Sequence, residues 1–129
     1  MKKYGLQLIL FTGLIFTLTQ CQSAKKGEKF VNGFFIAIMN QDYEKAVDMI
    51  DLPAIGNSTD ILQQVQLIGN NPINGQLKRF KKGMGFNTNI KNGVTTVELD
   101  YKLTYENGEN VVHVVTRDKG DGFKIVSVQ

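Results

Sequence analysis

Two residue types that often carry chemistry occur only once each in this chain of 129 residues, as Cys21 and His113. A single cysteine leaves no partner for an intramolecular disulfide, and one cysteine with one histidine forms no ligand cluster of usable spacing. Gly83-Met84-Gly85 lacks the continuation and the strand-to-helix context of a phosphate-binding loop. We therefore expect neither a metal centre nor a bound cofactor, and the chemistry of Cys21 must be sought in its flanking sequence.

The first twenty residues have the pattern of a signal peptide. Lys2 and Lys3 give the N-terminus a positive charge, and residues 6–18 are an apolar run of thirteen residues. A run of this length suits a signal peptide and is short for a membrane-spanning helix. We therefore predict that residues 1–20 direct export and do not belong to the folded domain.

The four residues that end at the cysteine, Leu-Thr-Gln-Cys, resemble the lipobox of bacterial lipoprotein precursors, although that family usually has Gly, Ala or Ser where Gln20 stands. The resemblance implies cleavage before Cys21 and lipidation of its thiol, with residues 21–27 as a lipidated tether. The domain would then be anchored in a membrane of the cell envelope and face the periplasm or the exterior. An ordinary secretory cut after Ser23 or Ala24 and an uncleaved N-terminal anchor are the alternatives.

The charge balance of the exported part argues against a nucleic-acid partner. The whole chain has a formal net charge of +3, but without residues 1–20 thirteen Lys and Arg face twelve Asp and Glu. A nearly neutral domain has no electrostatic footprint for nucleic acid. The one basic run is Lys78-Arg79-Phe80-Lys81-Lys82, which is typical of a strand edge protected by lysines. Contact of this run with anionic lipid or glycan near the anchor is the functional alternative.

Apolar residues at helical spacing predict helices in the first part of the domain. Residues 27–40 place phenylalanines and aliphatic residues on one stripe. Asp42 is expected to cap a second helix that ends at Leu52-Pro53, because the residue before a proline is disfavoured in the helical region. A third helix is expected over about residues 60–68, capped by Ser58 or Thr59.

After Pro72 the period of the apolar residues changes to two, which predicts strands. The expected segments are 75–82, 86–91, 94–106, 109–118 and 123–128, separated by glycine-containing turns. Asn92-Gly93 and Asn107-Gly108 are typical of two-residue hairpin turns, since both residue types tolerate positive φ. The first turn would pair Phe86 with Leu99, and the second would pair Leu99 with Thr116 and Tyr101 with Val114.

These two turns agree on which face of the sheet is buried, and a slip of one residue would reverse every side chain. The opposite face would pair Glu98 with Arg117 and Lys102 with His113. His113 is thus expected on the outer face, where the apolar neighbours Val111 and Val115 suggest a covering element. The buried face predicted by this register, which the resemblance described next makes the concave face, consists of Phe86, Thr88, Ile90, Thr95, Val97, Leu99, Tyr101, Leu103, Tyr105, Val112, Val114 and Thr116.

This order of elements resembles the nuclear-transport-factor-2-like, or cystatin-like, cone fold over residues 28–129. The similarity lies in FVNGFFIAIMNQDYEKAVDMI, an aromatic-rich first helix followed by a short helix, and in the final hairpin VVHVVTRDKGDGFKIVSV. The expected fold class is therefore α+β, with two to three N-terminal helices packed on a curved antiparallel sheet of four to five strands. In that family a pocket lies between the concave face and the helices, and some members are ketosteroid isomerases or polyketide cyclases.

The predicted concave face favours binding over catalysis. It holds no Asp, Glu or His, whereas the isomerase-like relatives need a general base in the pocket. Tyr101 and Tyr105 are the side chains that could donate hydrogen bonds to a ligand, although buried tyrosines usually find a backbone partner. We predict a membrane-anchored lipoprotein that binds a small apolar ligand or a protein partner without catalysis. An enzyme of the isomerase or cyclase kind, and a structural homodimer through the outer sheet face, are the alternatives.

Overall fold

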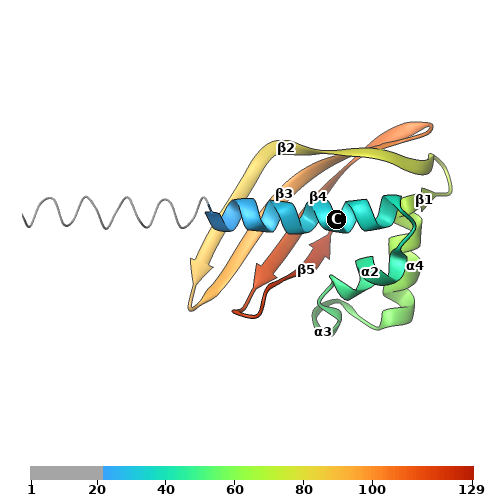
Figure 1. Cartoon of the computed structure of the whole chain (residues 1–129). Helices are drawn as coiled ribbons and strands as arrows, with labels where there is room; N and C mark the ends of the chain where they lie inside the picture. The colour runs from blue at the N-terminus through green and yellow to red at the C-terminus, as the bar shows by residue number, and fades with distance from the viewer. Residues whose placement is uncertain (1–21) are drawn as a thin grey trace, which may run out of the picture.

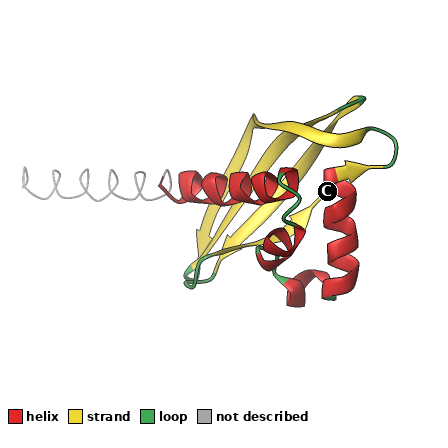
Figure 2. Cartoon of the chain, turned by 45° about the vertical axis from the view of Figure 1, so that its right-hand side comes forward, coloured by secondary structure: helices red, strands yellow, loops and turns green. Residues whose placement is uncertain are grey.

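The computed structural model describes residues 22–129, so the predicted signal peptide and Cys21 lie outside the described part. Four helical segments precede a five-stranded antiparallel sheet, which is curved and open, and the expected α+β class is confirmed (Figures 1 and 2). No helix among residues 22–129 is long and apolar enough to span a membrane. The helices comprise residues 22–39, α2 (Tyr43–Asp48), α3 (Leu52–Ile55) and α4 (Ser58–Gly69). The strands, in spatial order, are β1 (Asn70–Asn71), β2 (Gly75–Lys91), β3 (Val94–Tyr105), β4 (Gly108–Asp118) and β5 (Phe123–Val128).

The first helix lies across the concave face of the sheet and supplies much of the core (Figure 1). Its stripe of Val31, Phe34, Phe35 and Ile38 is buried, as the helical spacing predicts. Residues 22–27, which we expected to form a tether, are helical. Gly27 is buried so close to the sheet that an added Cβ would lie 3.0 Å from Cβ of Val97. The packing of the first helix on the sheet therefore begins at Gly27, and residues 22–26 extend the same helix before that point.

The shorter helices begin at polar caps. Oδ1 of Asp42 accepts a hydrogen bond from the backbone N–H of Lys45 at 3.3 Å, which confirms the predicted cap of α2. The cap of α4 is Asn57 rather than Ser58 or Thr59, and its side chain accepts from the N–H of Asp60 at 3.0 Å. Between these helices the Leu52-Pro53 step starts the single turn α3, because proline suits the first turn of a helix.

The hairpin between β2 and β3 has the predicted register. Phe86 pairs with Leu99, and the pairing continues to Lys91 and Val94 across the turn. Asn92 and Gly93 have φ values of 54° and 76°, which is the left-handed conformation that Asn-Gly favours. Local backbone preference alone accounts for this turn.

The hairpin between β3 and β4 differs from the prediction by two residues. Tyr105 pairs with Gly108, so the turn is Glu106-Asn107 and not Asn107-Gly108. The N–H groups of Glu106 and Asn107 donate to the carbonyl oxygens of Gln76 and Asn74, at 3.1 and 2.9 Å. Hydrogen bonds to the start of β2 therefore hold the turn one residue earlier than its Asn-Gly sequence suggests.

This shift keeps every side chain on its predicted face but changes its partners. Leu99 pairs with Val114 instead of Thr116, and Tyr101 pairs with Val112. The expected pairs of Glu98 with Arg117 and Lys102 with His113 are wrong, because Glu98 lies opposite Val115 and His113 opposite Asp100.

The segments 75–82 and 86–91 are one bent strand, β2. The pairing shifts between Lys82 and Phe86, where Gly83-Met84-Gly85 bulges outward. Within the described residues β2 pairs with β1 only at Gly75 and Gln76, so most of its length is a sheet edge. The basic run 78–82 thus lies on an edge strand, as predicted.

Candidate functional site

Tyr101, one of the two predicted ligand-binding residues, is completely buried at the centre of the concave face. Its ring lies against Phe35, with 5.0 Å between the ring centroids, and its hydroxyl donates to Oδ1 of Asn32 at 2.7 Å. Desolvation by burial, and then the negative charge of Glu28, raise the pKa of this hydroxyl. The hydroxyl already has an acceptor, and it ties the first helix to β3.

Tyr105, the second predicted ligand-binding residue, is also buried, four residues further along β3. Its hydroxyl donates to the carbonyl oxygen of Ile68 at 2.8 Å, so it connects β3 to the end of α4. Burial raises the pKa of this hydroxyl as well. Each tyrosine therefore makes the internal bond expected of a core tyrosine, and a ligand that used either hydroxyl would have to replace that bond.

The inner faces of β3 and β4 form the centre of the core. Val97, Leu99, Leu103 and Val114 are buried, and none of the side chains from these two strands in the described core is an acid or an imidazole. The neighbouring part of β2 is different, because Phe86 faces the same side and is 59% exposed. We expected Phe86 to be buried, but the first helix does not cover this edge of the sheet.

His113 lies on the outer face of the sheet, as predicted, and is 46% exposed there. Its Nδ1 lies 2.7 Å from Oδ1 of Asp100, and its Nε2 lies 4.0 Å from Oε1 of Glu98. The expected covering element is not present among residues 22–129, because the neighbouring Val111 is 70% exposed. No group of three or more residues that could hold a metal ion is found in the described part of the chain. The Asp100–His113 pair is therefore an exposed polar contact outside any pocket described here.

An apolar groove lies between α4 and β5, and we call it the α4–β5 groove. Its volume is about 320 Å³, and Phe34 of the first helix contributes to its lining. Gln64, Ser127 and Gln129 supply polar atoms beside walls that are otherwise aliphatic. The aliphatic lining consists of Ile50, Ala54, Ile55, Ile61, Val65, Ile68, Ile125, Val126 and Val128. A concave apolar surface with a few polar groups is the usual form of a small-molecule site.

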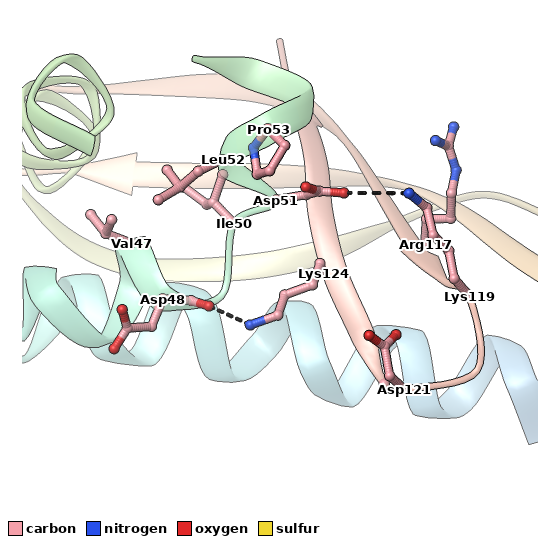
Figure 3. A pocket seen from close by; sticks show the side chains of 11 residues that line it. Val47, Asp48, Ile50, Asp51, Leu52, Pro53, Arg117, Lys119, Asp121 and Lys124 are labelled. Atoms are coloured by element: carbon pink, nitrogen blue, oxygen red, sulfur yellow. Dashed lines mark hydrogen bonds and ion pairs between the residues drawn. The ribbon is translucent and has the colours of Figure 1, made fainter. Parts of the chain in front are cut away.

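A second pocket, of about 440 Å³ and with more charged residues in its lining, lies between α2, α3 and the β4–β5 turn, and we call it the hairpin pocket (Figure 3). The ammonium group of Lys124 donates to the carbonyl oxygen of Asp48 at 2.6 Å. The ammonium group of Lys119 lies 4.0 Å from a carboxylate oxygen of Asp51. These two contacts connect the β4–β5 turn and β5 to the helices, so we interpret this pocket as a structural junction.

The α4–β5 groove was not predicted from the sequence. Ile61, Val65 and Ile68 repeat at helical spacing, so sequence periodicity identifies them as the apolar side of a helix. Periodicity does not show what faces such a stripe. Here β5 lies across from it, and the two elements leave a space between them that the core does not fill.

Comparisons with known proteins place the chain in no family. No family model matches the sequence, and no curated protein resembles it closely enough to be recognised as a relative.

Proposed function

We propose that this protein is a lipoprotein of the bacterial cell envelope, anchored through Cys21, whose domain binds a small apolar ligand without catalysis. The positively charged N-terminus, the apolar run of residues 6–18 and the Leu-Thr-Gln-Cys sequence support the anchor. The α4–β5 groove is the observation that supports ligand binding, because it is a concave surface, lined mainly by aliphatic residues, that the core leaves open.

The position of the groove suits a ligand from the aqueous phase. Phe34, which lines it, lies twelve residues beyond the start of the described helix, or about 18 Å along the helix axis. The proposed anchor precedes that start, so the groove is at the far end of the helix from the membrane. The ligand class is a compact aliphatic or aromatic molecule with one or two polar groups for Gln64 and Ser127.

Labelling with a radioactive fatty acid tests the anchor. The wild-type protein should carry the label in its mature form, whereas Cys21→Ser should carry none and should remain unprocessed or be secreted. An unlabelled wild-type protein cut near Ala24 would show that the lipoprotein assignment is wrong.

Thermal-shift screening with fatty, aromatic and sterol-like compounds tests the groove. A ligand of this site raises the melting temperature of the wild type by mass action. Ile55 lines the groove and is 37% exposed, so Ile55→Ser should remove most of that stabilisation at little cost to the fold. Leu67→Ser is the matched control, because Leu67 is 50% exposed on α4 and is not among the groove residues. Equal loss in both variants, or no stabilising compound at all, would contradict this proposal.

A further inference from the structure

The described helix leaves no flexible spacer between position 22 and the domain. Residues 22–27 are helical, and Gly27 packs directly on Val97 of β3. These six residues span only about 9 Å as a helix. If Cys21 is the anchor, as proposed above, the start of the helix and the surface around it are held close to the lipid headgroups.

Basic side chains gather around the start of the helix. Lys25, Lys26 and Lys29 are exposed on the helix itself, and Lys91 is exposed at the β2–β3 turn. Both views place this turn at the same end of the domain as the start of the described helix (Figures 1 and 2). Glu28 is the acid of this stretch of helix, and Lys82 of β2 lies 3.7 Å from it. The local charge is therefore positive, although the exported domain as a whole is almost neutral.

Two large apolar side chains lie on the neighbouring edge of the sheet. Met84, in the bulge of β2, is fully exposed, and Phe86 is 59% exposed. The ammonium group of Lys82 lies 5.3 Å from the centroid of the Phe86 ring, so Phe86 is adjacent to the Glu28–Lys82 contact. An exposed aromatic residue beside lysines is the combination that partitions to the interface of a bilayer.

We infer that this surface, formed by the lysines at the start of the helix and by Met84 and Phe86 on the β2 edge, lies on an anionic lipid bilayer. The inference rests on the proposed anchor, and it adds an orientation: the domain is tilted so that the β2 edge meets the membrane. Lysines near an anionic leaflet are attracted to it within the screening length of the solution. The aromatic ring and the thioether then leave water for the interfacial region.

The β4–β5 turn, at the same end of the domain as the β2–β3 turn but beside the other edge strand, supports this choice of orientation (Figure 1). Residues 117–124, around the β4–β5 turn, hold the acids Asp118 and Asp121 and the bases Arg117, Lys119 and Lys124. Lys119 lies 4.0 Å from Asp51. Oδ1 of Asp118 accepts hydrogen bonds from the N–H groups of Gly120 and Gly122, at 2.7 and 3.1 Å. An anionic surface therefore attracts this turn less than it attracts the β2 side, so electrostatics favour one tilt over the other.

The absence of tryptophan from the chain makes a direct test possible. Phe86→Trp introduces a single tryptophan at an exposed position, and its emission can be excited separately from that of the four tyrosines. Val111→Trp is the matched control, because Val111 is 70% exposed on β4 and lies outside the proposed contact surface. The mature, anchored protein is purified from membranes and reconstituted in vesicles of phosphatidylcholine, with or without phosphatidylglycerol. Flotation measures association, and tryptophan emission with brominated lipids measures contact with the bilayer.

In vesicles with phosphatidylglycerol, Phe86→Trp should show blue-shifted emission and quenching by brominated lipid, while Val111→Trp should show neither. Adding Lys25→Gln, Lys26→Gln and Lys91→Gln to Phe86→Trp, or raising the salt concentration, should reduce the quenching. A protein that floats with the vesicles but leaves both tryptophans unquenched would overturn the inference and leave the anchor intact. A protein that does not float would overturn the anchor, and with it the inference.

Discussion

The hydroxyl of Tyr101 donates a hydrogen bond of 2.7 Å to Oδ1 of Asn32 and so joins the centre of β3 to the first helix. The surrounding contacts between this helix and the sheet are largely apolar, and apolar contacts do not prescribe one position along the helix axis. A hydrogen bond is directional, so one in the middle of the interface fixes the position of the helix along its axis. The residue that we predicted as a ligand donor therefore positions the helix on the sheet.

Tyr101→Phe should lower the free energy of unfolding by about 1–3 kcal/mol, because it leaves the Asn32 oxygen without this partner in a largely desolvated site. Tyr105→Phe should also destabilise the fold, through loss of its bond to the Ile68 carbonyl. Urea denaturation measures both. Retained stability in Tyr101→Phe, together with loss of ligand stabilisation, would instead support a binding role for the hydroxyl.

Alkaline pH should destabilise the protein through the two buried tyrosines. Burial raises the pKa of Tyr101 and of Tyr105 above the ordinary value of 10.0, so the folded state holds these protons more tightly than the unfolded state. Their contribution to stability is full below about pH 10 and is lost as the pH rises toward the folded-state values. Unfolding followed by circular dichroism should show this loss, and Tyr101→Phe should weaken the pH dependence. Tyrosinate absorbance that rises at the ordinary pH for all tyrosines would contradict the prediction.

Two glycines of the first helix should respond to alanine in opposite directions. At Gly27 the new Cβ would lie 3.0 Å from Cβ of Val97, a buried and stiff side chain, so Gly27→Ala should destabilise the fold by about 1–3 kcal/mol. At Gly33 the nearest atom would be Cε of Met49 at 3.6 Å, which is ordinary contact. Gly33→Ala should therefore stabilise the protein by about 0.5–1 kcal/mol through helix propensity. If Gly27→Ala and Gly33→Ala changed the melting temperature equally, the helix would not be in close contact with Val97.

Double-mutant cycles distinguish the two possible registers of the β3–β4 hairpin. Asp100 and His113 are in contact, so replacing both with alanine should reveal a coupling of about 0–1 kcal/mol, with a value above zero at low salt. Glu98 and Arg117 serve as the comparison pair and should show a smaller coupling, because they are diagonal neighbours and not directly opposite each other. Coupling in the second cycle without coupling in the first would restore the register predicted from the Asn-Gly turn.

Much of the architecture follows from the sequence because its causes are local. Alternation of apolar and polar residues settles which face of β3 is buried, and the helical stripe settles which side of the first helix meets the sheet. Asn92-Gly93 forms its turn through the backbone preferences of those two residues. Asp42 caps α2 through a bond to the N–H of a residue three positions later. None of these features needs information from a distant part of the chain.

The remaining features were decided by contacts between distant segments. A shift of two residues in the β3–β4 hairpin leaves both faces unchanged, so the apolar pattern could not detect it, and hydrogen bonds from the turn to Asn74 and Gln76 selected it. Phe86 belongs to the inner face by its alternation, yet it is exposed because the first helix does not reach across that edge. Tyr101 and Tyr105 found acceptors in Asn32 and Ile68, 69 and 37 residues away in sequence. The α4–β5 groove exists only because β5 lies opposite the apolar stripe on α4. The spacing of apolar residues within α4 does not show which element packs against it.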